Sequence, residues 1–242
     1  MISSSLVAHR GYAGRHPENT RASVQAALDL GTRWIEIDLQ LTKDEVVVLY
    51  HDRTLDRVSG TPGAVHLLDW AELEGLNVSE PERLSDFESA TNAEPIVRLE
   101  EIAELGAQNS ETRWFLEVKR VAIEAHGVDV VLDRVLEAAA PLEGRFVLIS
   151  FSCDFLEAAR ERTAAPIAPI LEDWSQLSSA RLQAMEPEWV FCNRTRLPEA
   201  PTELPRDEPR MVIYEVTDAE EALSYLQRGA ELIETFDLED LN

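Results

Sequence analysis

Short apolar runs alternate with helix-like stretches along most of this 242-residue chain. The runs have the length of buried strands, and most of them precede a stretch with apolar residues at helical spacing. Residues 21–31 are an example, because they end in a glycine that suits a helix C-cap. Strands that alternate with helices form βαβ units. The pattern therefore predicts an α/β protein with a parallel sheet.

The number of strands narrows the fold class. The eight predicted strands are residues 5–9, 33–40, 113–119, 145–151, 166–171, 188–193, 210–216 and 231–236. Eight parallel strands in a chain of this length predict a single (β/α)8 TIM-barrel domain over residues 1–242. A doubly wound open sheet is the alternative, but the first strand–helix loop lacks the glycine pattern of dinucleotide-binding folds.

One connection is too long for a simple crossover. It contains an extra strand over 45–50, a turn region around Gly60 and Gly63, and a helix over 98–106. We expect a small insertion after the second barrel strand, at approximately 52–98, that forms a lid or a pocket wall.

The charge of the chain restricts its partners. Asp and Glu number 46 against 22 basic residues, which gives a net charge of −24. A nucleic acid or an anionic membrane is therefore not an expected partner. All but two of the basic residues are arginine, the exceptions being Lys43 and Lys119. An acidic, lysine-poor surface suits concentrated salt, so a salt-loving host is one hypothesis and an acidic mesophilic enzyme is the other.

No apolar run approaches the length that spans a bilayer, so we expect no stable membrane insertion. The N-terminal residues lack the features of a signal peptide. The two cysteines, Cys153 and Cys192, provide neither a disulfide framework nor a metal-ligand spacing. These features predict a cytoplasmic protein, and they leave its oligomeric state open.

Acidic residues lie where the predicted barrel strands end. Glu36 and Asp38 are two residues apart in one strand, so both side chains point to the same face, and Glu117 lies near the end of the next. Chemistry in a TIM barrel takes place at the C-terminal ends of the strands. Three carboxylates without cysteine suit a hard cation, Mg²⁺ or Ca²⁺. Taken alone, two acidic residues spaced as Glu36 and Asp38 are more typical of a strand face that is exposed to solvent.

Basic and titratable residues share this end of the predicted barrel. His9 and Arg10 follow the first strand, His51 ends the extra strand, and Lys119 follows Glu117. Two histidines supply an acid and a base, and a lysine with an arginine binds an anion beside the metal. A lone histidine is also typical of a structural role. Lys119 and Glu117 could equally form an ion pair that has no catalytic role.

The segment "AHRGYAGRHPENTRASVQAALDLGTRWIEIDLQLTKDEVVVLYHDRTLDRVSG" (8–60) resembles the opening of the glycerophosphodiester phosphodiesterase family. "FLEVK", "VLISFS" (147–152) and "VIYEVTDAEEALSYLQRGAELIET" (212–235) are similar to later strands of that family. The resemblance covers nearly the whole chain and is weakest at 61–98 and 194–209. It implies a TIM barrel with an insertion after the second strand.

The resemblance also implies an activity and roles for individual residues. The activity is metal-dependent hydrolysis of a small glycerophosphodiester to sn-glycerol 3-phosphate and an alcohol. One divalent metal ion, Mg²⁺ or Ca²⁺, would be held by Glu36, Asp38 and Glu117. His9 and His51 would be the acid–base pair. Arg10 and Lys119 would hold the phosphate.

Three further residues are expected to support the site. The resemblance gives Glu18 and Asn19 the role of ordering the first loop. Asp52 is expected to point away from His51 if the strand continues, and to support the loop. The chain departs from the family at Tyr214 and Thr217, and at "TFDLED" (235–240), which leaves the alcohol pocket undefined.

Two other functions stay open. The first is a lysophospholipase D or phosphoinositide-type phosphodiesterase on the same barrel, for which residues 64–76 would supply an apolar lip unless they pack as a helix. The second is a non-catalytic module that binds phosphodiesters, although no metal-binding carboxylate or histidine is missing from the sequence.

Overall fold

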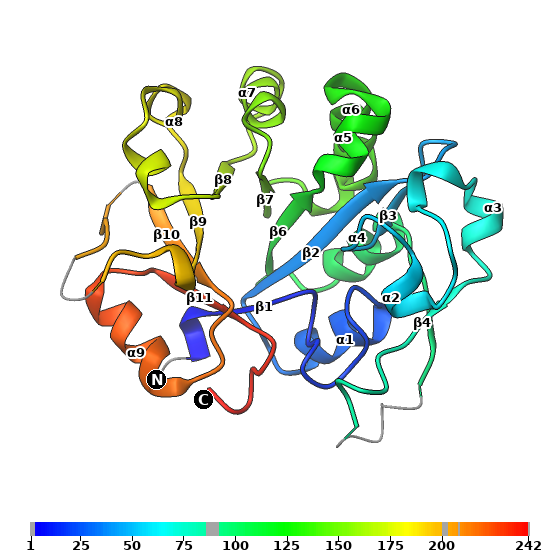
Figure 1. Cartoon of the computed structure of the whole chain (residues 1–242), viewed down its shortest axis with the longest axis horizontal. Helices are drawn as coiled ribbons and strands as arrows, with labels where there is room; N and C mark the ends of the chain where they lie inside the picture. Colours follow the sequence, from blue (N-terminus) through cyan, green and yellow to red (C-terminus); the bar gives the residue numbers. More distant parts are fainter. Residues whose placement is uncertain (1–2, 86–91, 200–202, 208, 242) are drawn as a thin grey trace.

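Eight parallel strands close into a barrel in the computed structural model of the chain (Figure 1), which describes residues 3–85, 92–199, 203–207 and 209–241. The barrel strands are β1 (Leu6–Ala8), β2 (Trp34–Leu41), β6 (Arg113–Val118), β7 (Phe146–Ser150), β8 (Ile167–Leu171), β9 (Trp189–Asn193), β10 (Arg210–Tyr214) and β11 (Leu232–Thr235). Strand β1 pairs with β2 on one side and with β11 on the other, which closes the sheet. The fold is a (β/α)8 TIM barrel, and the eight predicted strands are confirmed.

Helices surround the barrel. They are α1 (Arg21–Asp29), α4 (Leu99–Ala107), α5 (Arg120–His126), α6 (Val128–Ala138), α7 (Cys153–Arg162), α8 (Ala180–Met185) and α9 (Ala219–Arg228), with the 3₁₀ turns η1 (Ser3–Ser5), η4 (Ala140–Leu142), η5 (Trp174–Ser178) and η6 (Arg194–Arg196). The 3₁₀ turn η5 and the helix α8 are separated at Ser179. The backbone of Ser179 is extended there, and its side chain accepts a hydrogen bond from the Leu182 N–H to cap α8.

The two faces of each barrel strand have different surroundings. In β2, Ile35, Ile37 and Leu39 pack with the helices in the outer apolar core. The residues between them point into the barrel, because strand side chains alternate. Further down, the interior is filled by a second apolar cluster that includes Phe115 and Phe191. The alternation therefore brings the acidic residues of β2 to the inner face.

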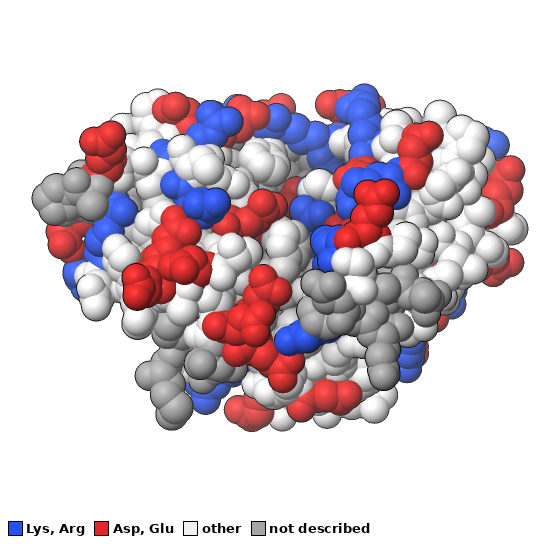
Figure 2. Space-filling view, turned by 60° about the horizontal axis from the view of Figure 1, so that its bottom comes forward, with Lys and Arg blue, Asp and Glu red and all other residues white. Residues whose placement is uncertain are grey.

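Charged side chains cover the outside. Figure 2 shows one face on which Asp and Glu gather in patches among scattered Lys and Arg. Many arginines lie against these acids, as Arg181 does against Glu157, with Nε and Oε1 2.7 Å apart. Within the described part of the chain, no helix is both long and apolar enough to cross a membrane.

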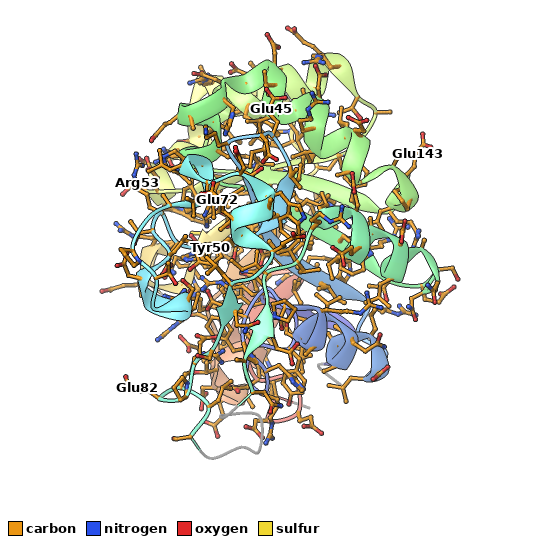
Figure 3. All side chains as sticks on the ribbon, turned by 90° about the vertical axis from the view of Figure 1, so that its right-hand side faces the viewer. Glu45, Tyr50, Arg53, Glu72, Glu82 and Glu143 are labelled. Carbon is orange, nitrogen blue, oxygen red and sulfur yellow. The ribbon has the colours of Figure 1, made fainter. Side chains whose placement is uncertain are left out.

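The segment after β2 covers one side of the barrel (Figure 3). It contains β3 (Val47–Leu49), which pairs antiparallel with β2, then α2 (Asp56–Ser59), η2 (Val65–Leu67), α3 (Trp70–Leu73) and the short pair β4 (Asn77–Val78) and β5 (Glu94–Pro95). A separate apolar cluster that includes Tyr50, Leu55 and Leu73 holds it together. Residues 86–91 of the predicted insertion lie outside the described residues.

Gly106 marks a place where α4 packs too closely for a side chain. A Cβ atom there would lie 2.5 Å from Trp114 and 2.8 Å from Leu142. We expect Gly106→Ala to lower the free energy of unfolding by about 1–3 kcal/mol, because overpacking a buried contact outweighs the gain in helix propensity. Urea unfolding of both proteins measures the difference.

Gly75→Ala is the matched control. It makes the same chemical change in the turn after α3, where a Cβ atom has no neighbour within 4 Å. We expect it to leave the stability unchanged or to raise it by up to about 1 kcal/mol, because alanine lowers the conformational entropy of the unfolded chain. Equal losses in the two variants would contradict the packing explanation.

Candidate active site

Three acidic side chains from two neighbouring strands meet inside the barrel. Glu36 and Asp38 lie on the inner face of β2, and Glu117 is the register partner of Asp38 in β6. All three are buried, and one carboxylate oxygen of each lies within 4.8 Å of those of the others. Two oxygens that bind one Mg²⁺ or Ca²⁺ ion lie within about 4–5 Å, twice the metal–oxygen distance. The spacing therefore suits a single hard cation.

The hydrogen bonding of Glu36 supports the same assignment. Its Oε2 atom accepts from the Arg10 N–H at 3.1 Å. Its Oε1 atom is buried and finds no hydrogen-bond partner in the described part of the chain. A buried carboxylate oxygen without a partner is costly, and a cation would compensate it. The residues present thus fit a divalent cation.

Asp38 is surrounded by donors. Its Oδ2 atom accepts from Asn19 Nδ2 at 2.7 Å and lies 3.3 Å from Arg10 Nε. Its Oδ1 atom accepts from Lys119 Nζ at 3.1 Å. Burial alone would raise the pKa of Asp38, but the charges of Lys119, His51 and Arg10 outweigh it and hold that pKa well below its usual range. Asp38 is therefore ionised throughout the physiological pH range.

Lys119 forms the ion pair that its spacing from Glu117 allows. Its Nζ atom donates to Glu117 Oε1 at 2.7 Å as well as to Asp38. Burial opposes its positive charge, but these two carboxylates keep the pKa of Lys119 above its usual value. The ammonium group lines the cavity described below while it balances part of the acidic cluster.

Glu234 is a fourth carboxylate in the buried cluster inside the barrel, and the sequence analysis missed it. It lies in β11 with 3% of its surface exposed, and its Oε1 atom has no hydrogen-bond partner in the described part of the chain. Burial, followed by the charge of Glu117, raises its pKa well above the usual value. Burial and the charge of Asp38 do the same to the pKa of Glu36. The two-residue alternation that identified Glu36 and Asp38 would also have identified Glu234. In β11 it places Glu234 on the inner face of the strand and Ile233 on the outer face.

His9 is enclosed between the acids and an aromatic ring. Its ring stacks on Phe236 with the centroids 4.4 Å apart. Its Nε2 atom lies 3.8 Å from an oxygen of Glu36 and 3.8 Å from an oxygen of Glu234. Burial, with a further contribution from Arg10, lowers the pKa of His9 well below its usual value of 6.5. The imidazole is therefore neutral at pH 7.

His51 has a carboxylate partner. Its Nδ1 atom lies 2.7 Å from Asp52 Oδ1. Burial opposes the charge of Asp52, but hydrogen bonds from His51 and Arg57 lower the pKa of Asp52 well below its usual value. An ionised carboxylate can only accept, so Nδ1 carries the proton and Nε2 is available for other chemistry.

The expectation that Asp52 points away from His51 is wrong. It assumes that the strand continues, but β3 ends at Leu49, so the alternation of side chains no longer holds at residues 51 and 52. Arg57 of α2 fixes the Asp52 carboxylate from the other side, with Nε 2.5 Å from Oδ2.

The loop after β1 is tied to the site by Glu18 and Asn19. Glu18 Oε2 accepts from Arg10 Nη1 at 3.0 Å, and Asn19 both donates to the Asp38 carboxylate and accepts from the Asp38 N–H. Arg10 and Asn19 both have a φ of 56°, a strained conformation that these contacts maintain. Glu80 of the covering segment accepts from the Glu18 N–H at 2.9 Å.

A cavity of about 90 Å³ opens among these groups. Seven of the polar side chains described above line it, namely His9, Arg10, Glu36, His51, Glu117, Lys119 and Glu234, whereas Asp38 does not. The opposite wall is largely apolar, formed by Ile149, Phe151, Ile170, Phe191 and Tyr214, with Glu215 beside them. The structure thus brings the predicted acidic, basic and histidine side chains to one place, with an apolar wall facing them.

Residues 9–202 match the family model described as the Glycerophosphoryl diester phosphodiesterase family. A glycerophosphodiester phosphodiesterase of Bacillus altitudinis is 32% identical over 148 residues, which cover 61% of this chain and 58% of that protein. Human lysophospholipase D is 43% identical over 70 residues, 29% of this chain and 22% of that protein. The matched part thus spans little more than half of the first relative and less of the second.

Solved structures share the fold. A phosphodiesterase of Oleispira antarctica, solved with the product sn-glycerol-3-phosphate, superposes with a TM-score of 0.80 at 21% identity over 98% of this chain and 94% of its own. A glycerophosphodiester phosphodiesterase of Thermotoga maritima superposes with a TM-score of 0.70 at 20% identity, over 97% and 95% of the two chains.

Glu234→Gln tests the role of the fourth carboxylate. A carboxyl group with a raised pKa in the folded state destabilises the protein above its unfolded-state pKa of about 4.5. At pH 8 in EDTA we therefore expect the variant to melt at a higher temperature than the wild type. We also expect its affinity for Ca²⁺ or Mg²⁺, measured by titration calorimetry, to fall about tenfold or more.

Glu161→Gln removes the same charge from an exposed position on α7 and is the control. It should change neither quantity. Glu234 has no part in cation binding if its variant binds the ion with wild-type affinity.

Proposed function

The chain belongs to the glycerophosphoryl diester phosphodiesterase family, and from this premise we propose that it hydrolyses small glycerophosphodiesters to sn-glycerol 3-phosphate and an alcohol. One observation carries the proposal: a single cavity is lined by two histidines, a cluster of carboxylates, a lysine and an arginine. Each group has a task in phosphodiester cleavage. The Oleispira structure, with its product bound, supports a substrate of this class.

The proposed metal ligands are Glu36, Asp38 and Glu117. Glu234 is added to them because its buried and unpartnered oxygen belongs to a carboxylate that lies beside Glu36 and His9. When bound, a divalent cation neutralises the charge of the phosphodiester and of its transition state. The clustering of carboxylates supports either Mg²⁺ or Ca²⁺ equally.

The histidines are proposed to divide the proton transfers. His9 is neutral and lacks a hydrogen-bond partner at Nδ1 in the described part of the chain, so it is suited to accept a proton from the nucleophile. His51 is oriented by the ionised Asp52 through its Nδ1 atom, which leaves Nε2 to face the substrate, so we assign it the protonation of the leaving alcohol. The nucleophile is water or a hydroxyl of the substrate glycerol.

Arg10 and Lys119 are proposed to hold the phosphate. Both lie at the cavity, and both are kept charged by neighbouring carboxylates. Glu18 and Asn19 support them indirectly, since Glu18 orients the Arg10 guanidinium and Asn19 orients Asp38. Asp52 positions His51, a more specific task than loop support.

Lysophospholipid hydrolysis is the second candidate activity. Human lysophospholipase D, which matches part of the chain, favours it. The segment proposed as an apolar lip exposes Leu67 at 61%, whereas Leu73 is fully buried. Leu68, Trp70 and Leu76 of this segment are half-buried, so it presents a small apolar surface and a water-soluble substrate is preferred. Comparing hydrolysis of glycerophosphocholine and lysophosphatidylcholine separates the two activities.

We expect His9→Ala and His51→Ala each to lower kcat by about 10²-fold or more, because each removes one proton transfer. Both variants should still bind Ca²⁺ or Mg²⁺ in calorimetry, and EDTA should abolish the activity of the wild type. Release of glycerol 3-phosphate from glycerophosphocholine is the assay.

His126→Ala is the control, since His126 ends α5 and does not line the cavity. Full activity in either His9→Ala or His51→Ala would contradict the acid–base assignment. A wild-type protein that binds glycerophosphodiesters without cleaving them at any metal or salt concentration would instead be a binding module.

A further inference from the structure

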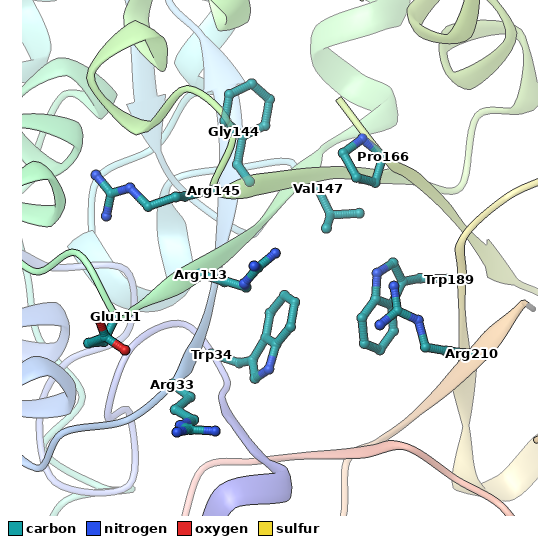
Figure 4. A pocket seen from close by; sticks show the side chains of 11 residues that line it. Arg33, Trp34, Glu111, Arg113, Gly144, Arg145, Val147, Pro166, Trp189 and Arg210 are labelled. Atoms are coloured by element: carbon teal, nitrogen blue, oxygen red, sulfur yellow. The ribbon is translucent and has the colours of Figure 1, made fainter. Parts of the chain in front are cut away.

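A second cavity, of about 420 Å³, lies at the N-terminal end of the barrel and is lined by residues that begin its strands (Figure 4). We call it the basal pocket, defined by Arg33, Trp34, Arg113, Arg145, Trp189 and Arg210. Its volume falls within the range of small-molecule sites. It shares no lining residue with the catalytic cavity, which opens where the strands end.

Strand register builds the basal pocket from two similar pairs. Trp34 of β2 is the partner of Arg113 in β6, and Trp189 of β9 is the partner of Arg210 in β10. The two indoles meet edge to face with their centroids 5.1 Å apart. Each guanidinium lies over the indole of its own pair, at 5.9 Å for Arg113 and 3.8 Å for Arg210.

These guanidinium groups differ from most others on the molecule. Within the described residues, Arg33, Arg113 and Arg210 form no ion pair with a carboxylate and no hydrogen bond through their side chains. Elsewhere arginines meet acids closely, as Arg160 does with Glu188 at 2.8 Å. The contrast is notable in a chain with a net charge of −24.

Arg145 has a different task. Its Nη1 atom donates to the Gly106 and Asn109 carbonyl oxygens, which ties the loop before β7 to the end of α4. It therefore forms a fixed wall. Arg113 and Arg210 stack on an indole through the face of the guanidinium, which leaves the N–H groups at its edge without a partner among the described residues. Arg33 is exposed and likewise has no side-chain partner there.

We propose that the basal pocket is a second binding site, for a small dianion such as a phosphomonoester. Two or three guanidinium edges around one cavity match the oxygens of a phosphate group. The lining contains one acidic residue, Glu111, against four arginines, so the local charge is positive where the rest of the molecule is acidic. The site is independent of the proposed catalytic function.

Inorganic phosphate is the probe. We expect the tryptophan fluorescence to change and reach saturation as phosphate is added in the millimolar range. The sodium chloride concentration is lowered at each step so that the ionic strength stays constant. Two of the five tryptophans, Trp34 and Trp189, line the basal pocket, and no tryptophan lines the catalytic cavity. Phosphate held at Arg10 and Lys119 should therefore contribute little to it.

The double variant Arg113→Gln/Arg210→Gln should weaken phosphate binding about tenfold or more. It should keep its phosphodiesterase activity, since neither residue lines the catalytic cavity. The control is Arg162→Gln/Arg181→Gln, which removes the same charge from arginines paired with acids on the outer helices. It should bind phosphate as the wild type does.

Circular dichroism establishes that the double variant is folded. If the double variant is not folded, the Arg33→Gln variant is used in its place. Arg33 is exposed, so this variant should fold normally and bind phosphate more weakly. Unchanged affinity in the folded pocket variant would overturn the proposal. So would a fluorescence change that sodium chloride alone reproduces, or one that the outer-helix control loses equally.

Discussion

Repulsion among buried carboxylates is the constraint on which the rest of the catalytic end depends. Glu36, Asp38, Glu117 and Glu234 all lie inside the barrel, where water cannot screen them. The protein balances them unevenly. Asp38 has a lysine, an arginine and an amide around it, whereas Glu36 and Glu234 each retain an oxygen without a partner in the described residues. A cation bound on that side of the cluster would offset the uncompensated charge.

Much of this arrangement follows from the sequence because it depends on local periodicity. Alternation in β2 determines that Ile35 and Ile37 face the helices and that Glu36 faces inward, whatever the rest of the chain does. The same alternation applies to β11, where Ile233 packs in the outer core and Glu234 faces inward. The number of barrel strands also follows from local sequence, because each strand is a buried apolar run bounded by clear turns.

Other parts depend on contacts that no local pattern encodes. The orientation of Asp52 follows from where β3 ends and from the position of Arg57 on the covering segment. Arg57 also donates to Glu18 and Glu80, so it joins three segments that are far apart in the sequence. The basal pocket likewise depends on strand register, which brings Arg210 beside Trp189 and Arg113 beside Trp34.

Closure of the barrel joins strands that are far apart in the sequence, and the site lies across this junction. β1 pairs with β11, so Leu6 must meet Ile233, and these residues lie near opposite ends of the chain. The pairing brings His9, just after the first strand, next to Glu234 of the last. Any fluctuation that separates β1 from β11 therefore also separates His9 from Glu234, so the geometry of the site depends on the closure of the barrel.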